Sequence, residues 1–263
     1  MAGSFVTKLY EEYADLYDVA FDWDVGEEVD WLMTRLDSDC RSVLEPGCGS
    51  GRILAAIAQR GVEAVGLDLS QPMIEIARRR FQDTSVEATV VLADITRFQL
   101  DRLFDGAVCP INTLMHLSPE ELSCHLDVMA QHLKVGARYL VQLDLYDSEA
   151  DAAEVPPERW EMTRGDMALR VSWRTEPVDP ATQQVRQHSR IEILSGGRAG
   201  EVVEEKHVMT AWTPTTWAAV VAASPFAPTA VFDGYQDDRP LVDAGRPGQL
   251  LWHELTRQSQ VSA

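Results

Sequence analysis

The chain has 263 residues, of which 42 are acidic and 23 are basic, so its formal net charge is −19. The negative charge opposes binding to nucleic acid and to anionic membranes, and no apolar run reaches the roughly 18–20 residues of a membrane span. Because there is also no signal-peptide pattern, we expect a cytoplasmic protein. Hydrophobic residues make up 45% of the chain, enough for a sizeable core in an α/β fold with one elaboration.

The cysteines show no spacing typical of metal ligands. We therefore expect free thiols and no metal site. The residues concerned are Cys40, Cys48, Cys109 and Cys124.

The N-terminal part of the chain, residues 4–36, has the pattern of two amphipathic helices. The segment Phe21-Asp22-Trp23-Asp24 separates them. We expect residues 1–40 to form a helical cap.

Strands alternate with helices through residues 42–145, which is typical of a doubly wound parallel sheet. A Ser-x-x-Glu capping box at Ser118, with Pro119 after it, predicts the start of the last helix, and Lys134-Val135-Gly136 predicts its end. The predicted strands are 42–46, 63–67, 87–92, 104–109 and 137–145, and the predicted helices are 51–60, 71–82 and 119–134.

After residue 150 the pattern changes to polar and apolar residues in alternation, which predicts an antiparallel sheet. Its predicted strands are 167–176, 183–195 and 201–212. A short helix at 214–223 and strands at 229–234 and 249–256 would then return to the main sheet. The predicted organisation is a Rossmann-like core at 41–150, an antiparallel β lid at 151–212 and a C-terminal return at 213–263.

The most informative segment is the glycine-rich turn that joins the first strand to its helix. It reads Glu45-Pro-Gly47-Cys-Gly49-Ser-Gly51, and the second strand ends at Asp68. Glycines allow a ligand to approach the backbone, and a carboxylate at the end of the next strand accepts hydrogen bonds from ribose hydroxyls. The chain should therefore bind a nucleoside-containing cofactor.

The spacing of the glycines distinguishes between cofactors. A dinucleotide site requires a third glycine where this chain has Arg52, and a phosphate-binding P-loop requires a Gly-Lys-Ser/Thr that is absent here. An oxidoreductase is thus the weakest interpretation. The pattern Glu45-x-Gly47-x-Gly49-x-Gly51 instead resembles the first motif of class I S-adenosylmethionine (SAM) methyltransferases.

The resemblance implies a seven-stranded methyltransferase sheet, with SAM as cofactor and S-adenosylhomocysteine as product. Leu69 and Met73 follow Asp68 where this family places apolar residues against adenine, although Met73 also fits a helix core. Asp94 and Ile95 close the third strand, where they would contact the adenine, with a surface turn as the alternative for Asp94. The implied cofactor-binding residues are Tyr17, Glu45, Gly47, Gly49, Gly51, Asp68, Leu69, Met73, Asp94, Ile95 and Cys109.

Beyond the cofactor motifs, two segments resemble the SAM-dependent N-methyltransferases of amino sugars and related small molecules. They are Tyr13-Ala-Asp-Leu-Tyr17-Asp18 and Pro110-Ile-Asn112-Thr-Leu-Met-His116-Leu117. The resemblance implies that Tyr17 and His116 lie where cofactor and acceptor meet, and that His116 can accept a proton. A histidine packed in the core is the alternative for His116. The expected acceptor-side residues are Tyr13, Trp23, Asn112, Tyr146 and His207.

We therefore predict methyl transfer from SAM to a small-molecule acceptor, an amine nitrogen in the first instance, driven mainly by proximity and orientation. Three alternatives remain open: O-methylation with a histidine base, cyclisation or another non-methyl reaction of SAM, and a non-catalytic SAM-binding protein. The oligomeric state is also open, with a homodimer as one option.

Overall fold

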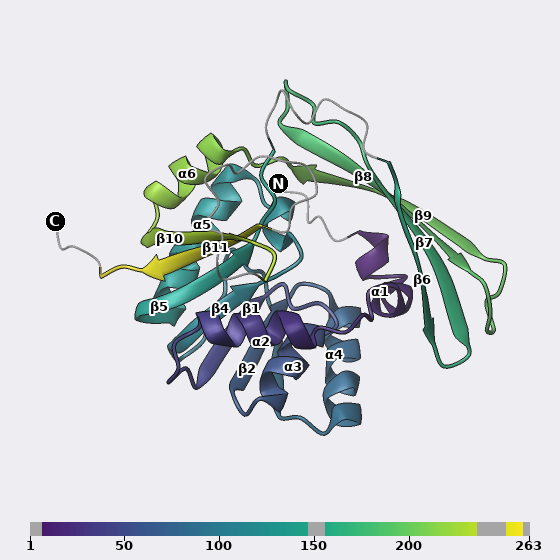
Figure 1. The fold of residues 1–263 in the computed structure, drawn as a ribbon, viewed down its shortest axis with the longest axis horizontal. Helices are drawn as coiled ribbons and strands as arrows, with labels where there is room; N and C mark the ends of the chain where they lie inside the picture. The colour runs from purple at the N-terminus through teal and green to yellow at the C-terminus, as the bar shows by residue number, and fades with distance from the viewer. Residues whose placement is uncertain (1–6, 147–155, 236–250, 260–263) are drawn as a thin grey trace.

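The computed structural model describes residues 7–146, 156–235 and 251–259. They form a seven-stranded mixed sheet and a separate four-stranded antiparallel sheet (Figure 1). The predicted Rossmann-like sheet with an antiparallel β insertion is confirmed. No described helix is long and apolar enough to cross a membrane.

The main sheet has the strand order β10-β11-β5-β4-β1-β2-β3. Strands β1 to β5 run parallel, whereas β11 is antiparallel to both β5 and β10. The carboxyl ends of five strands therefore meet at one edge, and the strand order reverses between β1 and β4. In open α/β sheets this switch point is where ligands bind. The strands are β1 (Ser42–Pro46), β2 (Glu63–Asp68), β3 (Ala88–Leu92), β4 (Phe104–Cys109), β5 (Leu133–Gln142), β10 (Phe226–Asp233) and β11 (Leu251–Arg257).

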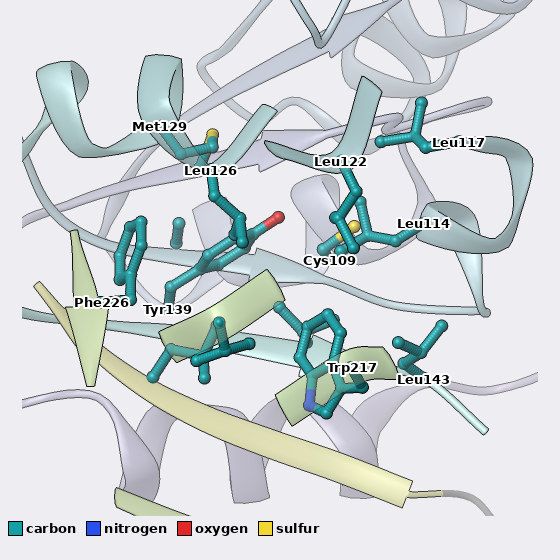
Figure 2. Close-up of a cluster of buried hydrophobic side chains, with 14 of the residues drawn as sticks. Cys109, Leu114, Leu117, Leu122, Leu126, Met129, Tyr139, Leu143, Trp217 and Phe226 are labelled. Atoms are coloured by element: carbon teal, nitrogen blue, oxygen red, sulfur yellow. The ribbon is translucent and has the colours of Figure 1, made fainter. Parts of the chain in front are cut away.

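Helices cover both faces of this sheet (Figure 1). On one face lie α2 (Gly26–Arg35), α3 (Arg52–Gln59) and α4 (Gln71–Thr84), whose apolar side chains share a buried cluster with β1 and β2. On the other lie α5 (Pro119–His132) and α6 (Pro214–Ala222). Figure 2 shows Leu122, Leu126 and Met129 of α5 in the second cluster, together with Tyr139 and Phe226.

Helix α5 begins at the predicted residue but ends before the predicted one. Both hydrogen bonds of the capping box between Ser118 and Glu121 are present. The predicted end at Lys134-Val135-Gly136 is wrong, because the helix stops at His132 and Leu133 already pairs with Phe104 of β4. Lys134 forms an ion pair with Asp105 and does not cap the helix.

The second sheet consists of β6 (Glu158–Arg164), β7 (Met167–Thr175), β8 (Gln184–Ile193) and β9 (Val202–Thr210). Three of these strands are predicted by the sequence, whereas β6 is not. The outer face of the second sheet carries ion pairs of Arg170 with Glu161 and Glu192, as expected for a solvated face.

The inner face of the second sheet is divided between a core and a cavity. At one end Leu169, Val171, Ile191 and Ile193 pack on helix α1 (Ala14–Ala20). At the other end Trp173 and His207 face an open space, described below. The same face thus anchors the second sheet and encloses a site.

A cluster of charged side chains holds helix α1 both to helix α4 of the main sheet and to strand β6 of the second sheet. The buried Asp18 carboxylate pairs with Arg80 of α4 at 2.7 Å and with Arg164 of β6 at 2.7 Å. Asp22 also pairs with both arginines, at 3.1 and 3.5 Å. Burial opposes ionisation of Asp18, but hydrogen bonds from Ser50 and Arg80 and the charges of both arginines hold its pKa below the usual value. This cluster joins the second sheet to the main layer through α1.

Replacing Asp18 with Asn should destabilise the protein by about 2–4 kcal/mol, because two arginines then lose their shared buried carboxylate. Asp15→Asn is the matched control, since Asp15 lies on the same helix in an exposed pair with Arg198 and should change stability by less than about 1 kcal/mol. Urea unfolding measures both. Equal effects of the two substitutions would show that the Asp18 cluster does not hold the layers together.

Candidate active site

One cavity of about 1290 Å³ lies between the carboxyl ends of β1–β5 and the inner face of the second sheet. The 3₁₀ helix η1 (Lys8–Tyr10) and α1 contribute Tyr10 and Tyr17 to its wall. The predicted site residues that line it are Tyr17, Trp23, Glu45, Gly47, Gly49, Asp68, Leu69, Met73, Asp94, Ile95, Asn112, His116, Tyr146 and His207. These side chains come from seven separate segments, so the fold brings the predicted residues together.

The glycine-rich turn after β1 forms the floor of the cavity. The N–H groups of Gly47 and Cys48 donate to the Leu67 carbonyl at 2.7 and 2.9 Å, which ties the turn to β2. Gly47 has φ +71°, and a Cβ there would lie 2.4 Å from the Thr113 methyl carbon. Gly49 has φ +52° with no atom within 4 Å of an added Cβ, so its backbone is open to a ligand.

Asp68 fixes this turn from the end of β2. Its carboxylate accepts hydrogen bonds from the Gly49 and Ser70 N–H groups, each at 2.8 Å. Burial raises the pKa of Asp68 despite these bonds. The Leu69 N–H also donates to this carboxylate, which leaves lone-pair capacity for a donor such as a ribose hydroxyl.

Glu45 supplies a free acceptor below the turn. Its Oε2 atom is buried and has no hydrogen-bond partner among the described residues. Burial raises the pKa of Glu45 well above its usual value, while the charge of Arg52 acts against the rise. A buried acceptor without a donor is costly, so this atom suits the ammonium group of an amino-acid tail. The glycine turn, Glu45 and Asp68 together fit SAM.

The predicted adenine side lies beyond Asp68. Leu69 is 46% exposed, and Ile95 is partly buried. Asp94 accepts from the N–H and hydroxyl of Thr96 and pairs with Arg97, and these contacts hold its pKa below the usual value against the effect of burial. Met73 lines the cavity but is only 1% exposed and packs against Ala14 and Ile76. Both interpretations of Met73 thus remain compatible with its position.

Arg52 begins α3 and does not reproduce a dinucleotide turn. Its guanidinium lies over the Trp23 ring, 5.0 Å from the centroid, and burial lowers the pKa of Arg52, although the nearby carboxyl groups of Glu28 and Glu45 oppose the fall. The side chain therefore occupies the space that a third glycine would leave open.

A group of aromatic rings surrounds His116 at the centre of the cavity. The Tyr10 hydroxyl lies 3.4 Å from Nε2 of His116, and Tyr10 packs edge-on against Tyr17 at 5.2 Å. Burial lowers the pKa of His116 to about 4, with a smaller contribution from His207. Burial likewise lowers the pKa of His207 to about 4 and raises that of Tyr17 to about 12. All three side chains are therefore neutral at pH 7.

Three predicted site residues lie outside the cavity lining. Gly51 has φ +71° and contacts Phe81, so it serves the packing of α3 on α4. Cys109 is fully buried, with its thiol 3.6 Å from the Pro46 carbonyl, and lies among core side chains in Figure 2. Tyr13 packs beside the guanidinium of Arg198. All three residues therefore take part in packing and not in the lining of the cavity.

Several polar residues that line the cavity are missing from the sequence prediction, among them Tyr10 and Asp144. Tyr10 contacts both His116 and Tyr17, but nothing in the local pattern distinguishes it from Tyr13. Asp144 lies just after the carboxyl end of β5, much as Asp68 lies at the carboxyl end of β2, and this shared position could have identified it. No group of three potential metal ligands is present among the described residues.

Comparisons with known proteins agree with this geometry. Residues 43–136 match the Methyltransf_25 family, described as a methyltransferase domain. The chain is 29% identical over 159 residues to the cypemycin N-terminal methyltransferase of Streptomyces sp., covering 60% of this chain and 62% of that protein. It is 30% identical over 139 residues to dTDP-4-amino-2,3,4,6-tetradeoxy-D-glucose N,N-dimethyltransferase of Saccharopolyspora spinosa, covering 50% and 54%.

Each of these alignments spans little more than half of the relative's length. The crystal structure of Streptomyces venezuelae DesVI superposes with a TM-score of 0.77 at 19% identity, covering 93% of this chain and 98% of that one. The family match supports the predicted methyltransferase domain over residues 43–136, and the superposition shows that the fold is shared.

Replacing Gly47 with Ala should weaken SAM binding at least about tenfold, because the new methyl group meets Thr113 and the left-handed backbone disfavours it. Gly61→Ala is the matched control: Gly61 has φ +78° with nothing within 4 Å of its added Cβ. Calorimetric titration with SAM compares the two. Unchanged affinity in Gly47→Ala would contradict the assigned role of the turn.

Proposed function

We propose that this chain, whose residues 43–136 form a methyltransferase domain, transfers the methyl group of SAM to the nitrogen of a small-molecule amine. The observation that carries the proposal is the single cavity, which joins the turn that fits SAM to a second region enclosed by β6–β9. Of the two curated relatives above, one is named as an N-terminal methyltransferase and the other as an N,N-dimethyltransferase of a dTDP-linked amino sugar.

When bound, SAM would supply a methyl group on a positively charged sulfur to the lone pair of the amine, with the C–S electron pair left on sulfur and one proton of the methylated nitrogen released to solvent. Glu45, Gly49 and Asp68 would hold the cofactor. The enclosing walls would exclude water and orient the amine, and such positioning contributes about 7–11 kcal/mol to a bimolecular step.

Nitrogen is favoured over oxygen by the state of His116. A histidine whose pKa is lowered to about 4 is a weak base, and activating a hydroxyl nucleophile requires a stronger one. A neutral amine carries a lone pair and needs no such base. His116 and Tyr10 would then position the acceptor and fill the cavity centre.

O-methylation with His116 as base is the second candidate, because the ring lies in the cavity beside Tyr10 and close to His207. Cyclisation of SAM and binding without turnover are distinguished by their products. Methyl transfer releases S-adenosylhomocysteine, cyclisation releases methylthioadenosine, and a non-catalytic protein releases neither.

Replacing His116 with Ala should lower kcat for an amine acceptor by no more than about tenfold, whereas loss of a general base lowers rates by roughly 10²–10⁴-fold. The measurement is S-adenosylhomocysteine formation under saturating SAM and acceptor. Calorimetry with SAM provides the control, because intact cofactor affinity shows that the variant is folded. A loss of several orders of magnitude with intact SAM binding would favour the histidine-base mechanism.

A further inference from the structure

The strand order divides the cavity into two halves. The ends of β1, β2 and β3 carry the glycine turn, Asp68 and Asp94, which form the cofactor half. The ends of β4 and β5 lie on the other side of the switch point and carry Asn112 and Asp144, which form the acceptor half together with the inner face of β6 and β7. A ligand in the acceptor half would therefore meet Asp144 on one side and the second sheet on the other.

Asp144 is held in place by a strained loop. Ile111 and Asn112 have φ values of +56° and +54°, a left-handed conformation that a β-branched residue such as isoleucine rarely adopts. The Gln142 side chain accepts from the Ile111 N–H at 2.7 Å, and Asn112 exchanges two 2.8 Å hydrogen bonds with Asp144. Strain of this kind persists where the surroundings impose it, commonly at ligand-binding sites.

The Asp144 carboxylate has room for another donor. One oxygen accepts from Asn112 and the other from the Leu251 N–H at 3.3 Å, so lone pairs remain on both. Burial raises the pKa of Asp144 to about 6, and the charge of Glu158 adds to the rise, but the group is still ionised at pH 7.5.

The wall opposite consists of indole faces. Trp160 donates its N–H to the Ala20 carbonyl at 2.7 Å, and Trp173 donates to Gln187 at 3.1 Å. Both N–H groups thus have partners within the protein, and both rings line the cavity. One face of Trp173 is stacked on His207, with the ring centroids 5.2 Å apart, so Trp160 and the remaining surface of Trp173 offer the cavity an apolar, cation-attracting wall. Glu158 is the register partner of Trp173, so a second carboxylate borders this wall.

The charges of the acceptor half are negative. The two arginines that line the cavity among the described residues, Arg52 and Arg97, both belong to the cofactor half. In the described part of the acceptor half, Asp144 and Glu158 face no lining lysine or arginine. A diphosphate there would meet like charges, which costs affinity, whereas an ammonium group would be attracted.

We propose that the acceptor is an aryl-alkyl or similarly apolar amine, which binds as an ammonium ion at Asp144 with its apolar part on Trp160 and Trp173, and that amines carrying a nucleoside diphosphate are rejected. The ammonium ion would pass one proton to the Asp144 carboxylate, and the lone pair freed on nitrogen would then form the bond to the methyl group. This inference rests on the proposed function and narrows its substrate class. The acceptor would thus differ from the dTDP-linked sugar named for one of the relatives.

The test is calorimetric titration at pH 7.5 of the protein saturated with S-adenosylhomocysteine. The ligands are 2-phenylethylamine, its uncharged analogue 2-phenylethanol, and a dTDP-linked amino sugar. We expect 2-phenylethylamine to bind at least tenfold more tightly than the other two. Equal or tighter binding of the dTDP-linked sugar would overturn the proposal.

Three variants locate the amine. Asp144→Asn and Trp173→Leu should each weaken 2-phenylethylamine binding at least fivefold. Glu158→Gln, on the inner face of β6, should weaken it more than Glu161→Gln, on the outer face of the same strand, which provides the matched control. Unchanged amine affinity in Asp144→Asn, or equal effects of the two glutamate substitutions, would contradict the assigned subsite.

S-adenosylhomocysteine affinity is measured for every variant and should stay constant. This measurement distinguishes failure of the proposed function from failure of the proposed acceptor class. If the unmodified protein did not bind S-adenosylhomocysteine, the proposed function itself would be contradicted. Intact binding combined with a preference for the dTDP-linked sugar would overturn only the acceptor class. Should Asp144→Asn fail to fold, Trp173→Leu and the glutamate pair still decide the outcome.

Discussion

The shared ion pairs of Asp18 and Asp22 with Arg80 and Arg164 are the interaction on which the enclosed cavity depends. The main sheet alone presents an open edge, where the glycine turn and the strand-end carboxylates are exposed to solvent. The cluster fastens α1 to α4 and to β6 at the same time, which sets the second sheet opposite that edge. Enclosure then lowers the pKa of His116 and His207 by desolvation and leaves the indoles of Trp160 and Trp173 facing the acceptor half.

Much of the main sheet could be predicted because its signals are local. The Ser118 capping box and the apolar runs of β1, β2 and β4 each carry their own structural preference, and the structure reproduces them. Strand β6 was not predictable in the same way, since only Trp160 and Met162 are apolar within Glu158–Arg164. The end of α5 was misplaced because pairing of Leu133 with Phe104, a contact distant in sequence, prevails over the glycine at position 136.

In the candidate site too, residues that belong to a local motif were predictable, whereas residues placed by tertiary contacts were not. Glu45, Gly47, Gly49 and Asp68 follow from a motif with fixed spacing, and the fold places all of them on one cavity. Tyr10 and Asp144 depend on how separate elements meet, and Cys109 depends on which face of a buried strand it occupies. The acceptor half is therefore defined mainly by tertiary packing: the strand-end position of Asp144 can be read from the sequence, but its placement on one cavity with Trp173 is visible only once β5 and the second sheet are seen together.

The most direct test of the central claim uses SAM with a ¹³C-labelled methyl group, incubated with the protein and a panel of aryl-alkyl amines, amino sugars and matching alcohols. Nuclear magnetic resonance then identifies the atom that carries the label, and chromatography identifies the nucleoside released. We predict labelled N-methyl product together with an equal amount of S-adenosylhomocysteine. Label on oxygen or carbon, or release of methylthioadenosine, would contradict the assignment of this cavity as the site of amine methylation.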